Sequence, residues 1–276
     1  MAVHYDGSME DKKQESASPG SASIDRHQAD HTPEAVRRRL HAGPSGRYLR
    51  DFIYGGIDGA VTTFAVVAGV AGARLASSIV VVLGVANLLA DGFSMAVSNY
   101  LGTRAEGQQR ERLRMIEEEH IERYPEGERE EVRQIFAAKG FVGDDLERVV
   151  AVITAERERW VETMLNEEHG FSPSGSSPGA AAAITFAAFV VVGALPLLTF
   201  VWQVIVPPEL EITHPFVWSS ILTGVSFFVV GAAKSRFVGQ SWLIAGLETL
   251  AMGSVAAVLA YVVGALLRGL VGGGVG

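Results

Sequence analysis

Long apolar stretches alternate with strongly polar ones along this chain. Five apolar stretches, each about 18 to 27 residues long, cover residues 52–73, 77–100, 180–203, 216–233 and 241–267. A helix rises about 1.5 Å per residue, so each stretch can cross the roughly 30 Å hydrocarbon layer of a membrane. The pattern predicts an all-α protein with five membrane-spanning helices, and it excludes a soluble enzyme.

The polar segments separate the spans into two groups, residues 47–100 and 180–268. Residues 1–46 contain almost no large apolar side chains, so we expect a disordered tail that cannot bury enough surface to fold. The remaining polar segments are an insert at 101–171, a linker at 172–179 rich in Ser, Pro and Gly, and a Gly-rich tail at 269–276.

The insert has the pattern of a helical domain. Three helices are predicted, over residues 101–123, 126–139 and 144–169. Tyr124-Pro125, Gly140 and Gly170 follow them, and these residue types commonly end helices. The sequence therefore predicts a three-helix domain between the second and third spans.

Positive charge predicts the orientation in the membrane. Arginines gather before the first span and after the second, and Lys234 and Arg236 separate the fourth span from the fifth. Because Lys and Arg favour the cytoplasmic side, the N-terminus and the insert should be cytoplasmic and the C-terminus outside. No apolar stretch follows the first residue, so we expect an integral protein of a bacterial inner membrane without a cleaved signal peptide.

The amino-acid composition excludes further kinds of site and partner. The chain has no cysteine, which excludes disulfides, thiolate metal sites and a thiol nucleophile. Its net charge of −8 argues against nucleic acid as a partner, and the apolar spans make membrane lipid the expected surroundings.

Ionisable and sulfur-containing side chains inside the spans are candidate residues of a transport pathway. They are Asp58, Thr62, Asp91, Met95 and Glu248. Ionisable groups are costly within a bilayer and usually face a helix bundle or a wet cavity. Carboxylate oxygen combined with thioether sulfur suits a divalent transition metal better than Mg²⁺ or Ca²⁺. The alternative is that Asp91 lies near the membrane surface and merely caps the helix or reaches into water, and that Met95 and Met252 fill gaps in the core.

Small residues predict where helices approach closely. Gly55 and Gly59 lie one turn apart on the first span and would admit another helix, either of a second copy or of the same chain. Pro196 should kink the third span, because proline cannot donate the helical hydrogen bond.

The insert carries pairs of potential metal ligands, each on one face of a helix. The pairs are Glu117 with His120, Glu128 with Glu131, and Met164 with Glu168. Packed helices could pool such residues around metal ions, as carboxylate-bridged bundles do. The alternative is that Glu-rich helices with interspersed Arg are simply solvated.

Two motifs resemble a known family. Residues 50–63 have the sequence Arg-Asp-Phe-Ile-Tyr-Gly-Gly-Ile-Asp-Gly-Ala-Val-Thr-Thr, which looks like the first-span signature of the vacuolar iron transporter family. Residues 91–100, Asp-Gly-Phe-Ser-Met-Ala-Val-Ser-Asn-Tyr, resemble its Ser-Met-Ala motif in the second span. The resemblance covers about residues 47–267 and includes the five spans and the position of the insert.

The resemblance implies a homodimer that exports Fe²⁺, and often Mn²⁺, from the cytosol in exchange for protons along a path at the dimer interface. It implies that Asp58 and Met95 form the membrane metal site and that the insert is a metal-binding domain. The chain departs from the family pattern at His120, Leu165 and Asn99, which stand where Glu, Met and Glu are usual, and Asp91 is an extra carboxylate. These departures bear on metal preference and proton coupling.

The leading hypothesis is a proton-coupled divalent metal exporter and not an enzyme. No cofactor is expected to be bound permanently, and Fe²⁺, with Mn²⁺, Co²⁺ or Zn²⁺ as further possibilities, would be the substrate. The competing hypothesis is a membrane-anchored ferroxidase or metal-storage protein whose carboxylate bundle does the chemistry. Asp58 discriminates between them, because a mere anchor has no use for a carboxylate within its first span.

Overall fold

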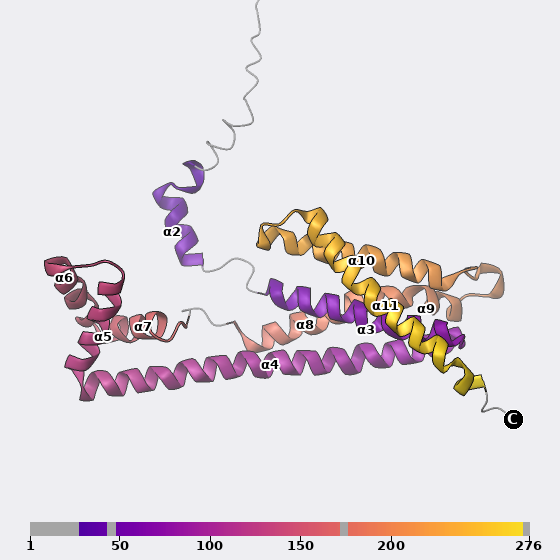
Figure 1. Ribbon diagram of the computed structural model, residues 1–276, viewed down its shortest axis with the longest axis horizontal. Coiled ribbons are helices and arrows are strands. Elements are labelled where there is room, and N and C mark those ends of the chain that lie inside the picture. Colours follow the sequence, from indigo (N-terminus) through magenta and orange to yellow (C-terminus); the bar gives the residue numbers. More distant parts are fainter. Residues whose placement is uncertain (1–27, 43–47, 172–175, 273–276) are drawn as a thin grey trace, which may run out of the picture. The chain divides into compact units, whose positions relative to one another are not determined.

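A computed structural model describes residues 28–42, 48–171 and 176–272 (Figure 1). The chain divides into two compact units, residues 1–45 and 46–276. In the first unit, helix α2 spans Pro33–Ala42, inside the segment that we expected to be disordered. Most of that predicted tail, together with the first half of the linker and the end of the Gly-rich tail, lies outside the described residues.

The predicted membrane spans are confirmed as helices. In the described part of the chain, five helical segments are long and apolar enough to cross a membrane, and no strand occurs. They are α3 (Leu49–Ala73), α4 (Ser77–Arg123), α8 with α9 (Pro178–Gly193 and Leu198–Ile205), α10 (Pro215–Val238) and α11 (Trp242–Gly272). The all-α fold class is therefore correct.

Helix α3 packs against α4, α8, α10 and α11. Its glycines make the closest approach possible, because a Cβ at Gly55 or Gly59 would overlap the backbone carbonyl of Thr185 or Phe189 on α8. The glycine face is thus occupied by a helix of the same chain. Our expectation that this face could serve a second copy is wrong, and the intramolecular alternative is right.

The third span is broken where the sequence predicts a kink. A short 3-10 helix, η1 (Leu195–Leu197), separates α8 from α9 at Pro196. The Ser219 hydroxyl on α10 donates a 2.6 Å hydrogen bond to the Pro196 carbonyl oxygen, so the irregular backbone has a partner within the protein.

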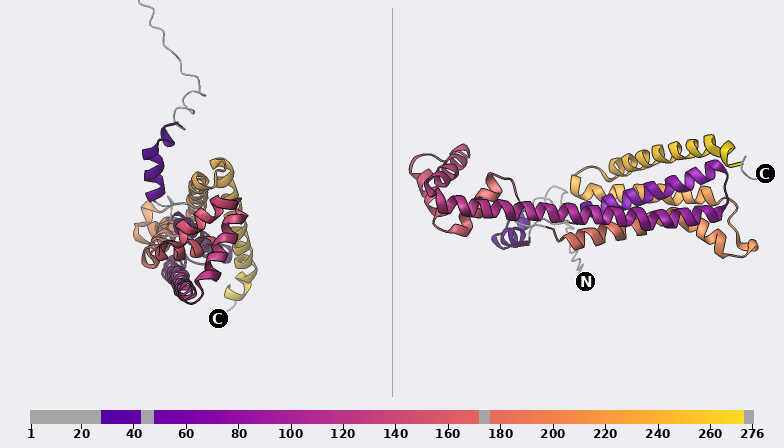
Figure 2. Two further views of the ribbon diagram at one scale, coloured as in Figure 1. Left: turned by 90° about the vertical axis from the view of Figure 1, so that its left-hand side faces the viewer. Right: turned by 90° about the horizontal axis from the view of Figure 1, so that it is seen from below.

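The second span and the first predicted helix of the insert are one element. Helix α4 continues for 47 residues without a break, and the right-hand view of Figure 2 shows it as a single rod. No proline interrupts residues 101–123, so nothing stops the helix at the edge of the apolar stretch.

The insert contains one helix more than we predicted. After α5 (Pro125–Ala138), the expected helix 144–169 is divided into α6 (Gly143–Thr154) and α7 (Arg157–Glu167). The break falls at residues 155–156, in the middle of a six-residue run, 154–159, that includes no large apolar side chain. Arg159 stabilises the turn by donating 2.7 and 2.5 Å hydrogen bonds to the Val152 carbonyl oxygen and to Glu156.

The break between α6 and α7 lets both helices contribute to one apolar core. This core contains Val132 from α5, Val150 and Ile153 from α6, and Trp160 and Met164 from α7. The insert is therefore a small helical domain built on the end of the long helix α4.

Candidate metal sites

Two polar clusters contain most of the candidate residues, one between α3 and α4 and one in the insert. In the first, the Thr62 hydroxyl donates a 2.9 Å hydrogen bond to the Asp58 carbonyl oxygen. The Asn87 amide on α4 donates to Thr62 Oγ1 at 3.3 Å. Asp91 follows Asn87 by one turn and is close enough to Asp58 for their charges to interact. The structure therefore brings Asp58, Thr62 and Asp91 together.

Asp91 also lies on an exposed face of α4. The Asp91 side chain is exposed, and so are those of Ser94 and Ser98, which lie one and two turns further along the same face. Asp91 is the fifteenth residue of α4, well inside its apolar part. A carboxylate at that depth is costly against lipid, so this face requires cover by protein or water.

Met95 lines a cavity of about 280 Å³ between α3, α4 and α8. The Asn99 amide, which lines the same cavity, donates to Asp51 Oδ1 at 3.0 Å and to Thr185 Oγ1 at 2.7 Å. The Asp51 side chain is buried. Sequence reasoning assigned Asp51 no role because it directly precedes the first apolar stretch, although its place inside the motif of residues 50–63 was a usable signal.

Glu248 has a different environment. Its Oε2 lies 3.6 Å from the Lys234 ammonium, and both side chains are partly exposed. The structure thus places Glu248 in an ion pair between α11 and α10. Because Lys234 was counted only as a loop charge, sequence reasoning did not anticipate this partner.

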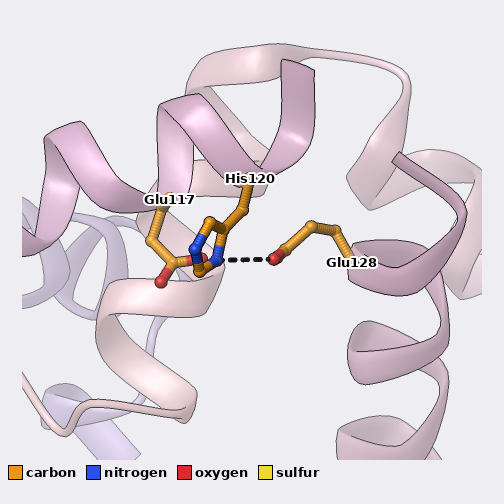
Figure 3. A group of neighbouring side chains, drawn as sticks. All are labelled: Glu117, His120 and Glu128. Carbon is orange, nitrogen blue, oxygen red and sulfur yellow. Dashed lines mark ion pairs between the residues drawn. The ribbon is translucent and has the colours of Figure 1, made fainter. Parts of the chain in front are cut away.

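In the insert, three of the predicted ligands converge. Figure 3 shows Glu117 and His120 of α4 and Glu128 of α5 pointing toward one another. Nδ1 of His120 lies 3.1 Å from Oε1 of Glu128. The side chains of Glu117 and Glu128 are only 3% and 4% exposed, and one carboxylate oxygen of each has no hydrogen-bond partner.

A second group meets at the same carboxylate. Nε2 of His169 lies 2.8 Å from Oε1 of Glu117, and Oε2 of Glu168 is 4.0 Å from that nitrogen. One ligand atom each from Glu117, Glu168 and His169 lies within 4.8 Å of the others, as is also true of Glu117, His120 and Glu128. Sequence reasoning missed His169, although its position beside Glu168 was a signal.

The carboxylates of the insert lie close together and are partly buried, and both effects raise pKa values. Burial raises the pKa of Glu128 to about 7, and the charges of Glu117 and Glu131 add to the rise. Burial also raises the pKa of Glu168, with Glu117 and Glu131 contributing. A bound cation would relieve this repulsion and give the unpartnered carboxylate oxygens a partner.

The other two predicted ligands are placed differently. Glu131 is exposed, although its charge acts on Glu128 and Glu168. Met164 is completely buried in the apolar core with Val132 and Trp160. In this structure Met164 is a packing residue, and its role as a ligand stays a prediction.

Many other acidic residues of the insert pair with arginine. Arg110 makes two hydrogen bonds, of 2.8 and 2.7 Å, to Glu162, and Arg114 contacts Glu158 at 2.5 Å. These pairs join α4 to α7. The solvated, ion-paired alternative therefore describes these positions, whereas the buried Glu117 and Glu128 do not fit it.

The spans and the insert together match the model of a known protein family. The model of the VIT family covers residues 49–265, nearly the whole of the second unit. The chain belongs to the VIT family. The candidate residues of both clusters, and Glu248 on α11, all fall within the matched range.

Several curated relatives support the same assignment. A vacuolar iron transporter of Toxoplasma gondii is 33% identical over 236 residues, which cover 84% of this chain and 78% of the relative. Vacuolar iron transporter 1 of Arabidopsis thaliana is 31% identical over 218 residues, or 79% of this chain and 85% of the relative. The family's members are transporters and not enzymes, as the sequence predicts for this chain.

Proposed function

We propose that this chain exports divalent metal, Fe²⁺ first and Mn²⁺ second, from the cytosol in exchange for protons. The names of its relatives support iron as the cargo. The observation that carries the proposal is the paired placement of Asp58 and Asp91 between α3 and α4. The ferroxidase alternative loses its support, because the relatives are transporters.

The two carboxylates offer a simple basis for exchange. When both are ionised they repel each other, and either a proton or a divalent cation relieves the repulsion. Binding of one therefore competes with binding of the other. That competition is the physical requirement for antiport.

The cavity beside Met95 supports a route to this pair. Met95 and Asp91 lie one turn apart on α4, and the cavity adds the carboxylate of Asp51. Carboxylate oxygens near a thioether sulfur suit a divalent ion of intermediate softness, such as Fe²⁺. The insert would collect metal at the Glu117 cluster and raise its concentration near the spans.

A homodimer would cover the exposed face of α4. Two copies paired across a two-fold axis would bring two Asp91 faces together and exclude lipid from the carboxylates. We place the N-terminus and the insert in the cytoplasm and the C-terminus outside a bacterial inner membrane, because positive charge favours the cytoplasmic side.

Proteoliposomes with a pH-sensitive dye test the proposal. An inward-directed Fe²⁺ gradient should drive proton movement in the opposite direction, and Asp58→Asn should abolish both fluxes. Metal flux without proton flux would reject antiport, and the absence of any metal flux from correctly inserted protein would reject transport.

A further inference from the structure

His169 lies beside the candidate metal ligands of the insert, although it matches no position in the ligand pattern of the sequence. Its Nε2 lies 2.8 Å from Oε1 of Glu117. With Glu117 and Glu168 it forms a group whose ligand atoms lie within 4.8 Å of one another. Two donors that are each about 2.1 Å from one ion lie at most about 4.2 Å apart, so the three atoms would need to approach by no more than about 0.6 Å to share an ion.

The end of α7 fixes the position of this histidine. The backbone N–H of His169 donates to the Met164 carbonyl oxygen at 3.3 Å, and that of Phe171 donates to the Leu165 carbonyl oxygen at 2.9 Å. Gly170 between them has a φ of 70°, a conformation that glycine adopts readily. The imidazole is therefore held beside Glu117 by the helix end.

A buried atom points independently to a ligand. The Glu117 side chain is 3% exposed, and its Oε2 has no hydrogen-bond partner, since His169 contacts Oε1. Buried carboxylate oxygens are normally hydrogen-bonded. Oε2 of Glu128 also has no hydrogen-bond partner. Glu128 belongs to the other candidate group, which consists of Glu117, His120 and Glu128 and so shares Glu117.

We infer that His169 is a metal ligand and that, together with His120, it makes the insert favour Fe²⁺, Co²⁺ and Zn²⁺ over Mn²⁺. The inference rests on the proposed metal-binding role of the insert. Imidazole nitrogen suits iron and zinc, whereas a site made of carboxylates alone suits Mn²⁺. His169 and His120 each contact a buried carboxylate, so each group combines nitrogen with oxygen.

Metal titration of the full-length protein in detergent tests this inference. The protein carries Asp58→Asn to weaken the membrane site, and Co²⁺, Zn²⁺ and Mn²⁺ are titrated separately by calorimetry. His169→Gln should weaken Co²⁺ and Zn²⁺ binding at least about tenfold and Mn²⁺ binding less than about threefold. It should also change the visible absorption of the Co²⁺-loaded protein. The control is His214→Gln, at the exposed start of α10, which should change nothing.

The outcomes separate this inference from the proposed function. If His169→Gln leaves the absorption and all three affinities unchanged, or weakens all three equally, His169 is only an ion-pair partner of Glu117 and the inference is wrong. Loss of binding in Glu117→Gln would then still support metal binding by the insert. If the parent protein binds none of the three ions, the proposed role of the insert fails, and the inference fails with it.

Discussion

Asn87 donates its side-chain amide to Thr62 Oγ1 at 3.3 Å, and this contact sets the register between α4 and α3. Residue numbers increase in opposite directions along the facing parts of the two helices, since Asn99 meets Asp51 in the same way. Asp58 lies one turn before Thr62 on α3, and Asp91 lies one turn after Asn87 on α4. The two carboxylates are therefore at the same level. The hydrogen bond holds two like charges together at membrane depth.

Replacing Asp58 with Asn should abolish transport while the protein still folds and inserts. Asn is nearly the same size but cannot exchange a proton for a cation. The measurement is Fe²⁺ uptake by proteoliposomes, with insertion checked by protease protection. Wild-type uptake by the variant would contradict the role of Asp58.

The matched control is Asp145→Asn in the insert. The Asp145 side chain is 78% exposed, and its contact with Arg148 is long, at 3.9 Å. Exposed pairs contribute little to stability, so both folding and uptake should remain unchanged.

Met95→Leu should reduce Fe²⁺ and Co²⁺ transport severalfold with less than about 1.5 kcal/mol lost in stability, because the swap nearly conserves volume but removes the sulfur. Metal uptake and thermal unfolding are measured on the same preparations. The control is Met252→Leu, whose side chain is 67% exposed. Equal effects of the two substitutions on uptake would show that the Met95 sulfur is not a ligand.

Much of the fold could be predicted because it depends on local patterns. The length of the apolar stretches locates the spans, and Pro196 marks the break in the third one. The division of residues 144–169 was missed, because it depends on how α6 and α7 share a core and on Arg159 at the turn. Such contacts leave no periodic signal in the sequence.

The candidate sites were predictable to the extent that ligands repeat along one helix. Spacing identified Glu117 with His120 and Glu128 with Glu131, but it could not distinguish the buried members from the exposed Glu131. It also missed Asp51 and His169, whose partners Asn99 and Glu117 lie about fifty residues away in the sequence. These pairings depend on the packing of α4 against α3 and α7.

The metal-free insert should lose stability as the pH rises from about 4.5 to about 7, because Glu128 holds its proton up to a pKa of about 7 when folded. In that window the folded state binds more protons than the unfolded state, so raising the pH favours unfolding. The loss is at most about 3 kcal/mol and levels off above pH 7. Hydrogen exchange of α5 in the full-length protein measures it.

Glu128→Gln should reduce this pH dependence, because Gln does not titrate, and the remainder should come from Glu168, whose pKa is also raised by burial. Bound metal should reverse the trend, since the ion needs the ionised carboxylate and binds more tightly as the pH rises. Exchange rates that stay constant from about pH 5 to about pH 8 in the metal-free parent, after correction for intrinsic exchange, would show that Glu128 is not protonated in the folded state.

Gly59→Ala should destabilise the protein by several kcal/mol, because the new methyl group would overlap the Phe189 carbonyl oxygen on α8. Gly69→Ala is the matched control on the same helix. There the added methyl group would lie 3.6 Å from the Ala260 carbonyl oxygen, an ordinary contact. Thermal unfolding in detergent compares the two, and equal melting temperatures would contradict the close approach of α3 and α8.

A cysteine at Ser94 should form a disulfide with its symmetry mate if the Asp91 faces of two α4 helices meet in a homodimer. The natural chain has no cysteine, so a single introduced thiol reports on one position. Ser94 is exposed and lies one turn from Asp91 on the same face of α4, the helix whose apolar part is mostly uncovered. Oxidation in native membranes should yield a dimer on a non-reducing gel. Val255→Cys is the control, because Val255 is 61% exposed on α11. A dimer from Val255→Cys but not from Ser94→Cys would place the interface on α11 and leave Asp91 to a path within each chain.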